Sequence, residues 1–216
     1  MEYKARERYQ DKQIVQQYDE QRFRSLKGRL TDWLEKSAMV RAVRYANISP
    51  PAILLDIPCG TGRLSIELAQ AKYRIIAGDI SVSMLQRSRT KIGTVNSNLP
   101  MTYTVLDAAK LPFIPAIFDA VVSLRLFGHV PPPIRSQMIQ EFARVSKQYL
   151  IIAYYHRNCL QGRLRIRKRK TTGIPWYPVS FAEIDRELEQ AGLDRIKIFP
   201  MLLGISETVV VVARKK

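Results

Sequence analysis

A short loop with two glycines is the part of this 216-residue sequence best suited to bind a ligand. Residues 56–62 (DIPCGTG) follow an apolar stretch typical of a buried strand and precede a stretch typical of a helix. Gly60 and Gly62 allow a sharp turn and close approach of a ligand, and a helix beginning near Gly62 points unpaired amides at that ligand. A dinucleotide-binding loop needs a third glycine, and Ser65 stands in its place. Tight packing alone is also compatible with two glycines.

Three aspartates mark the ends of three successive predicted strands. Asp56 follows the first strand, Asp79 ends the second, 23 residues further on, and Asp107 ends the third. In an open α/β sheet ligands bind at this edge, and a carboxylate after the second strand is suited to accept hydrogen bonds from ribose hydroxyls. Asp107 is placed to accept from an adenine amino group. A single aspartate is more often a helix cap or a solvated loop residue, but three at one edge favour a nucleoside-binding site.

Strands and helices must alternate to bring these residues together, and the hydropathy pattern has that form. We expect strands at 52–55, 74–77, 101–106, 118–123 and 149–154, with helices at 64–70, 83–92 and 133–146. Ser180 and Glu183 have the spacing of a capping box, so a further helix begins there and stops near Gly192. Two closing strands, 196–199 and 208–213, are joined too closely for a crossover helix and must pair antiparallel.

The predicted fold class is therefore α/β, a doubly wound Rossmann-like sheet. We expect seven strands, mostly parallel with an antiparallel C-terminal pair, and helices on both faces. Residues up to about 46 have apolar positions three and four apart, which predicts helix. We divide the chain into an N-terminal helical segment (1–48) and an α/β domain (49–216) that contains a basic insertion (155–180).

Several stretches of the chain, in order, resemble the successive motifs of class I S-adenosylmethionine-dependent methyltransferases, of the type that acts on small molecules and lipids. They are residues 54–70, 78–81 with Met84, 107–113 and 118–123, and the resemblance covers roughly residues 54–153. It implies the seven-stranded fold and methyl transfer as the activity, an enzyme of the EC 2.1.1 class. S-adenosyl-L-methionine is the implied cofactor and S-adenosyl-L-homocysteine the implied product.

The resemblance also implies a set of cofactor contacts. These are Asp56, Pro58, Cys59, Gly60, Thr61, Gly62, Asp79, Ile80, Met84, Asp107, Ala108, Ser123 and Tyr18. Within that set, Asp56 and the two glycines would hold the methionine end, Asp79 the ribose, and Asp107 with Ala108 the adenine. Pro58 departs from the family pattern because it replaces the usual first glycine. Proline restricts φ to about −65° and removes an amide donor, so the loop must tolerate both.

Two histidines follow the fourth and fifth predicted strands, where the reacting group of an acceptor would lie. Methyl transfer from a sulfonium mainly needs alignment of the acceptor and exclusion of water, and a base helps where the acceptor arrives protonated. His129 and His156 are candidates for that base or for orienting the acceptor. The alternative is that each only caps a loop or bonds a carbonyl. We expect His129→Ala to lower turnover and leave cofactor affinity nearly intact.

In methyltransferases of the type that this chain resembles, an N-terminal helical segment folds over the cofactor as a lid. Tyr18 and Arg22 lie in such a segment here and would contact the cofactor or the acceptor. A helix that packs its apolar stripe on the sheet is the other interpretation, and the two are compatible. Truncation before Arg24 is expected to weaken cofactor binding if the segment is a lid.

Basic residues outnumber acidic ones by 35 to 19, which leaves a formal net charge of +16. They concentrate at residues 163–170, where Leu164 and Ile166 alternate with arginines in a strand-like pattern. This segment would hold a phosphate, a carboxylate, an RNA backbone or an anionic membrane surface, or would be a solvated loop. The residues expected on the acceptor side are Arg22, Arg125, Tyr154, Arg163, Arg165 and Arg167.

The composition argues against several classes of protein. No apolar run approaches the roughly 20 residues of a membrane span, and the charged N-terminus lacks an apolar signal segment. We therefore expect a cytoplasmic protein, or one peripheral to the membrane. Two cysteines cannot make a disulfide scaffold, and no metal site is expected because no Cys/His cluster has zinc spacing.

The predicted function is direct in-line transfer of a methyl group to a small-molecule or lipid-linked acceptor that bears an acidic group. One alternative is an RNA methyltransferase that uses residues 163–170, and its affinity for RNA would fall steeply with added salt. The other is a non-catalytic protein that binds the cofactor and uses its basic surface for a partner.

Overall fold

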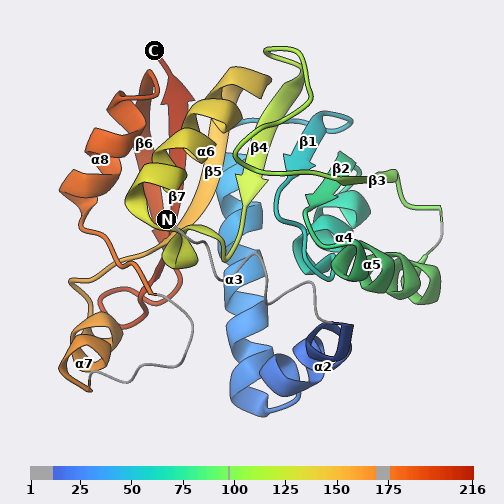
Figure 1. Cartoon of the computed structure of the whole chain (residues 1–216), viewed down its shortest axis with the longest axis horizontal. Coiled ribbons are helices and arrows are strands. Elements are labelled where there is room, and N and C mark those ends of the chain that lie inside the picture. The colour runs from blue at the N-terminus through green and yellow to red at the C-terminus, as the bar shows by residue number, and fades with distance from the viewer. Residues whose placement is uncertain (1–11, 97, 169–175) are drawn as a thin grey trace.

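The computed structural model describes residues 12–96, 98–168 and 176–216, and Figure 1 shows one sheet flanked by helices. The seven strands run in the order β3-β2-β1-β4-β5-β7-β6. Their bounds are β1 Ile53–Asp56, β2 Arg74–Asp79, β3 Met101–Val105, β4 Phe118–Ser123, β5 Ser146–Tyr155, β6 Leu193–Pro200 and β7 Thr208–Lys215. β7 is antiparallel to β5 and β6, and the other paired strands are parallel. The predicted fold class is confirmed.

Helices cover both faces of the sheet. On one face lie α3 (Leu26–Tyr45), α4 (Arg63–Gln70) and α5 (Val82–Val95), and on the other lie α6 (Pro132–Val145) and α8 (Phe181–Glu189). Alternate strand residues serve the two faces, so that Leu54 and Leu55 belong to different buried clusters. Because both faces are covered, the middle residues of the central strands are apolar on both sides of the sheet. Within the described residues, no helix is long and apolar enough to cross a membrane.

The predicted N-terminal helix consists of two helices, α2 (Lys12–Phe23) and α3. Ser25 begins α3, because its Oγ accepts a hydrogen bond from the Gly28 amide (3.1 Å). A side chain at residue 28 would collide with the end of α2, since a Cβ there would lie 2.2 Å from the Arg22 carbonyl oxygen. The chain therefore turns sharply between the two helices.

The two halves of α3 differ in burial. The second half packs on the sheet through Ala38, Met39, Ala42 and Val43, all fully buried. The first half projects past the sheet in Figure 1, and its apolar residues Leu26, Leu30 and Trp33 are exposed. The expectation that this segment packs its apolar stripe on the sheet is thus correct for the second half of the helix and wrong for the first.

The capping box and the helix stop that the sequence predicts after residue 179 are both found. The capping box of α8 is present, with Ser180 and Glu183 each bonding the other's backbone amide. Gly192 follows that helix with a φ of 72°, a left-handed conformation that suits glycine. Ser81 caps α5 by accepting a hydrogen bond from the Met84 amide (3.2 Å).

The basic segment corrects one prediction. Residues 160–168 form a helix, α7 (Leu160–Lys168), and not the strand that alternation of Leu164 and Ile166 suggested. The Cys159 carbonyl accepts from the Arg163 amide (2.9 Å), which closes the first turn. A helix satisfies its own backbone, whereas a strand needs a neighbour, and Arg, Leu and Lys are all good helix formers. The last part of the predicted segment, residues 169–170, lies outside the described residues.

Candidate active site

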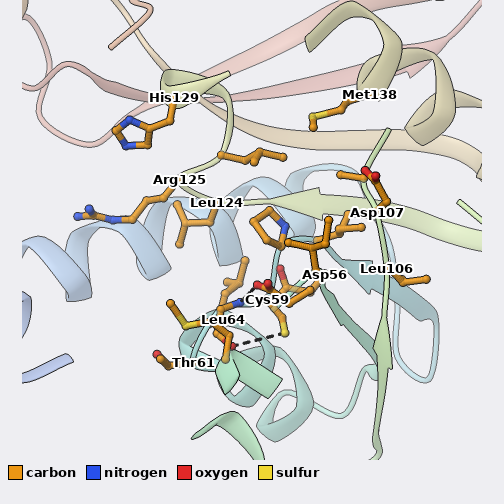
Figure 2. Close-up of a pocket in the computed structure, with 18 of the residues that line it drawn as sticks. Asp56, Cys59, Thr61, Leu64, Leu106, Asp107, Leu124, Arg125, His129 and Met138 are labelled. Carbon is orange, nitrogen blue, oxygen red and sulfur yellow. Dashed lines mark hydrogen bonds between the residues drawn. The ribbon is translucent and has the colours of Figure 1, made fainter. Parts of the chain in front are cut away.

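A cavity of about 660 Å³ opens at the carboxyl ends of the parallel strands. It is lined by the loop after β1, the ends of β2 and β3, the connection after β4, and residues of α2, α4, α5 and α6. This volume lies within the range of small-molecule sites. In Figure 2, Arg125 and His129 lie at one end of the pocket, and Leu106 and Asp107 at the other.

The glycine loop depends on two left-handed residues. Gly60 has a φ of 53° and Gly62 a φ of 76°, which side chains rarely adopt. At Gly62 a Cβ would also lie 2.1 Å from the Ser88 hydroxyl oxygen of α5. The loop tolerates proline at position 58 because other amides of the loop make the hydrogen bonds that hold it. One of them is the Cys59 amide, which donates to the Gly78 carbonyl (2.8 Å).

Asp79 ties the end of β2 to that loop. Its Oδ2 accepts from the Gly60 amide (2.9 Å) and its Oδ1 from the Ser81 amide (2.8 Å). A carboxylate has about four acceptor positions, so these hydrogen bonds leave acceptor capacity for the hydroxyls of a ligand. Burial raises the pKa of Asp79, although the amide hydrogen bonds oppose that rise. The side chain is thus pre-oriented and lines the cavity.

Asp56, at the end of β1, is held on one side only. The Ser65 hydroxyl donates to its Oδ2 (2.5 Å), so the serine in place of a third glycine orients the carboxylate. Asp56 Oδ1 is buried and makes no hydrogen bond to the described residues. Burial, together with the nearby Asp79 carboxylate, raises the pKa of Asp56 to about 7. A cationic group in the cavity would satisfy this oxygen and restore its charge.

The third aspartate follows β3. Asp107 Oδ1 accepts from the Ala109 amide (2.9 Å), which fixes the turn that carries Ala108 into the cavity wall. Two apolar side chains, Leu106 and Met84, are almost completely buried and line the same region. This end of the cavity therefore offers apolar contacts with a carboxylate beside them, which suits a flat, partly polar ring.

Arg125 and His129 lie on the connection after β4. Arg125 has a φ of 63°, a strained conformation for a side chain with a Cβ. Its Nε donates to Oε2 of the buried Glu35 of α3 (2.7 Å), which orients the guanidinium. His129 ends a short 3-10 turn (Phe127–His129) and packs edge-on against the Tyr155 ring, with centroids 5.5 Å apart. Both line the cavity.

Helix α2 lies against the glycine loop and contributes Tyr18 to the cavity. The Thr61 hydroxyl donates to Asp19 Oδ1 (2.8 Å), and the Lys91 ammonium of α5 pairs with Asp19 Oδ2 (2.6 Å). Arg22 donates to the Tyr18 hydroxyl (3.1 Å) and lies over its ring. We call Asp19, Thr61 and Lys91 the α2 latch. Its position is that of a lid, and the lid role stays a prediction.

Most predicted cofactor contacts line one cavity. These are Tyr18, Asp56, Pro58, Cys59, Gly60, Thr61, Asp79, Ile80, Met84, Asp107 and Ala108. The structure does not bring Gly62 and Ser123 to its wall. Gly62 is the N-cap of α4, and Ser123 is buried in β4. Their positions support the site without lining it.

Some of the residues predicted on the acceptor side line the cavity and others do not. Arg125 lines it. Arg22 does not line it, but it donates a hydrogen bond to Tyr18, which does. Tyr154 does not line it, because its strand position directs the side chain into the core against Phe127. His156 does not line it either: it stacks on the Phe181 ring, with centroids 3.9 Å apart, and burial lowers its pKa.

The arginines of α7 lie outside the cavity. Arg163 and Arg167 are exposed, and Arg165 pairs with the buried Glu207 (2.7 Å) and lies over the Trp176 ring. These three arginines therefore do not line the cavity, and their place on the acceptor side stays a prediction. The structure places them beside the site, on a helix that follows β5.

Several residues that line the cavity were not predicted from the sequence. Ile134, Gln137 and Met138 of α6 line the cavity, and their spacing of three and four on one helix face is a signal that could have found them. Arg63 lines it as well and pairs with Asp32, and its guanidinium lies over the Phe23 ring of α2. No sequence signal indicates the contacts of Asp19 with Thr61 and Lys91, because these residues are far apart in the chain.

Residues 54–149 match the model of a family described as a methyltransferase domain. This match supports the resemblance to class I S-adenosylmethionine-dependent methyltransferases. Among similar proteins is a magnesium-protoporphyrin O-methyltransferase of Synechocystis, 33% identical over 107 residues, 49% of this chain and 45% of that protein. A 2-phytyl-1,4-naphtoquinone methyltransferase of Synechocystis is 30% identical over 112 residues, again 49% and 45%. The chain thus spans less than half the length of these relatives.

Solved structures have the same fold as this chain. A magnesium protoporphyrin IX methyltransferase from Synechocystis, crystallised with bound SAH, superimposes with a TM-score of 0.75 at 22% identity, over 95% of this chain and 100% of that one. A possible histamine N-methyltransferase from Thermotoga maritima gives a TM-score of 0.69 at 20% identity, over 95% and 97%. S-adenosylmethionine is the cofactor of this class of methyltransferase domain, as predicted.

Proposed function

We propose that this chain binds S-adenosylmethionine in the cavity and transfers its methyl group to a small-molecule or lipid-linked acceptor that bears an acidic group. One observation carries the proposal. Asp56, Asp79 and Asp107, from three neighbouring strands, meet at one cavity whose far end holds Arg125 and His129. The cavity thus has a carboxylate-lined part suited to the cofactor and a cationic part suited to an acidic acceptor.

The residues present fit this cofactor. Asp56 Oδ1, buried without a hydrogen bond to the described residues, would accept from the methionine ammonium. Asp79 keeps acceptor positions for both ribose hydroxyls, and Asp107 with Ala108 would hold the adenine edge. When bound, S-adenosylmethionine supplies a methyl group already activated on a sulfonium. The chain therefore needs chiefly to orient the acceptor and exclude water.

The cavity also has apolar walls that would contact the acceptor. Leu124, Leu126, Ile134 and Met138 line it, as does Arg125, whose Nε is held by Glu35. The remaining guanidinium N–H groups are suited to a carboxylate or phosphate, for which arginine offers paired donors. An apolar acceptor with one acidic group fits these walls. The names of the two Synechocystis relatives, which refer to a porphyrin and a quinone, support an apolar ring as acceptor.

His129 is placed to hold or remove a proton. It is buried at the end of the cavity where Arg125 lies, and the Tyr155 ring restricts its imidazole. Where the acceptor arrives as a hydroxyl or an amine, an imidazole there can take its proton. Where it arrives as a carboxylate, His129 serves to orient it.

The test follows the methyl label. Purified protein, methyl-labelled S-adenosylmethionine and an extract of the source organism are incubated, and lipid, small-molecule, protein and nucleic-acid fractions are counted. Label in the lipid or small-molecule fraction supports the proposal, provided that the Asp79→Ala variant transfers none. Label in the nucleic-acid fraction that is lost on nuclease treatment would show that the acceptor is RNA, and would contradict a small-molecule or lipid-linked acceptor. Cofactor binding without label in any fraction would favour the non-catalytic alternative.

A further inference from the structure

The first half of α3 carries an apolar stripe that the fold does not use. Leu26, Leu30 and Trp33 follow each other at four and three residues, so they lie on one side of the helix. Their exposed fractions are 83%, 56% and 60%. No described residue buries them, although polar residues would serve equally well at exposed helix positions. Apolar residues gathered on a surface commonly mark an interaction site.

A second apolar group lies on α7 and the loop between β6 and β7. The backbone of α7 is attached to this loop, because the amides of Leu160 and Gln161 donate to the carbonyls of Gly204 (2.9 Å) and Ile205 (3.0 Å). The exposed apolar side chains of this group are Leu160, Leu164, Leu202, Leu203 and Ile205, and Leu203 is 84% exposed. We call this set the α7 patch.

Both groups lie at the same end of the molecule. In Figure 1 the first half of α3 and the whole of α7 extend past the sheet, on the side to which β4 points. The parallel strands end on that side, and the cavity with Arg125 and His129 opens there. The apolar groups therefore flank the end through which an acceptor would enter.

The exposed charge around these groups is basic. Arg24, Lys27 and Arg29 are exposed beside the α3 stripe, and Arg163 and Arg167 are exposed on α7. The acidic residues nearby are already paired. Asp32 pairs with Arg63 and Lys36, Glu35 with Arg125, and Glu207 with Arg165. The surface thus combines exposed leucines and a tryptophan with uncompensated positive charge.

Apolar side chains mixed with arginine and lysine are complementary to one kind of partner, the surface of an anionic bilayer. Leucine and tryptophan enter the boundary between headgroups and acyl chains, while basic residues remain at the anionic headgroups. A nucleic acid would contact the basic residues but would not need the exposed leucines. An acidic protein would not explain why the apolar residues lie on two separate elements, α3 and α7.

We propose that this end of the molecule docks on an anionic lipid bilayer, with the α3 stripe and the α7 patch at the boundary between headgroups and acyl chains. Docking would turn the acceptor end of the cavity toward the membrane. A lipid-soluble acceptor could then enter without crossing water. That consequence rests on the proposed function, whereas the docking itself does not.

Vesicle binding by the full chain tests the proposal. Sedimentation with vesicles of phosphatidylcholine, with and without phosphatidylglycerol, should show binding only where the anionic lipid is present, and weaker binding as salt shortens the Debye length. The Lys27→Glu/Arg29→Glu variant should lose at least about 25-fold in partition coefficient, since each charge contributes about fivefold. Its control is Arg214→Glu, an exposed arginine at the opposite end of β7, which should change little.

The apolar contribution is tested separately. Leu26→Gln/Trp33→Gln should lower binding by about tenfold or more, because two large side chains leave the lipid. Ile114→Gln, at a residue 70% exposed in the loop that leads to β4, is the matched control. The chain has two tryptophans, so Trp176→Phe leaves Trp33 as the only emitter. Its fluorescence should shift to the blue on vesicle binding and be quenched by brominated acyl chains.

Three results would overturn the docking. The first is no binding to anionic vesicles by protein that still binds S-adenosylhomocysteine in calorimetry, which separates this failure from failure of the proposed function. The second is loss of a dimer, seen by size exclusion, in Leu26→Gln/Trp33→Gln, which would assign the stripe to a second copy of the chain. The third is binding of an RNA oligonucleotide, and not of vesicles, through Lys27 and Arg29.

Discussion

The two ends of the cavity are built in different ways. At the cofactor end, Asp56, Asp79 and the glycine loop come from one run of about 25 residues, and hydrogen bonds from backbone amides and the Ser65 hydroxyl of that run hold their positions. At the acceptor end, Arg125 is held by Glu35, a partner 90 residues away in the chain. The first end is determined by local chain geometry, and the second by side chains that meet only in the folded protein.

This difference predicts how each end responds to change. Substitutions at the cofactor end should lower affinity for the cofactor, because they remove groups that bind it. Substitutions at the acceptor end should lower turnover while cofactor affinity is kept. Five changes test that separation.

The largest effect is expected at Asp79. Asp79→Ala removes two hydrogen bonds to ribose hydroxyls and the anchor of the Gly60 amide, so affinity for S-adenosylhomocysteine should fall by over 100-fold, or roughly 3 kcal/mol. Calorimetric titration measures it. Asp194→Ala, at an exposed position on β6, is the control and should bind normally. Affinity retained within a few-fold in Asp79→Ala would contradict the cofactor assignment.

His129→Ala should lower turnover by about 100-fold if the imidazole moves a proton. Affinity for S-adenosylhomocysteine should stay within about twofold, since the side chain lies at the other end of the cavity. Turnover is measured with the acceptor found by label transfer. Because His156 lies outside the cavity wall, His156→Ala serves as the comparison. Equal turnover in the wild type and in His129→Ala would show that His129 takes no part in the reaction.

Arg125→Met should reduce turnover by about 30-fold, because a charged hydrogen bond to the acidic group is lost. It should also lower thermal stability, since Glu35 is buried and loses its 2.7 Å partner. Adding Glu35→Gln should restore much of the melting temperature and none of the turnover. Recovery of both together would show that Arg125 acts only on stability.

The pKa of Asp56 gives a pH dependence with a definite sign. In the free protein this carboxyl is protonated below about pH 7, and the charged form is needed to bind an ammonium. Affinity for S-adenosylhomocysteine should therefore rise about tenfold from pH 6 to pH 7.5, as the proton leaves. Calorimetry in matched buffers measures this. The Asp56→Asn variant should bind S-adenosylhomocysteine weakly, with an affinity that does not change with pH. If the affinity of this variant still rises with pH, another group is the one that titrates.

The smallest effect is expected at the α2 latch. Asp19→Asn weakens the contacts with the buried Thr61 and the partly exposed Lys91, so affinity for S-adenosylhomocysteine should fall by about fivefold. Dissociation should become faster, because α2 lies against the glycine loop. Stopped-flow displacement measures the rate. Glu189→Gln, at an exposed position on α8, is the control. An unchanged dissociation rate would argue against a lid.

Much of the cofactor end could be predicted from the sequence. Asp56 and Asp79 each end a strand and Asp107 follows the next one, and parallel pairing brings those strand ends to one edge whatever the details of packing. The role of Ser65 could not be predicted, because it depends on where the first turn of α4 faces. The division of the chain into a segment 1–48, a domain 49–216 and an insertion 155–180 stays a prediction.

The sequence by itself determined the fold and most of its elements, because strand and helix periodicity and the cap at Ser180 are local properties of the chain. Only the tertiary structure decided that α7 is a helix, that Tyr154 points into the core, and that the stripe at Leu26 and Trp33 is exposed. An apolar side chain has the same local pattern whether or not a neighbour covers it. Burial depends on how distant elements pack, and the acceptor end and the proposed membrane surface depend on that packing.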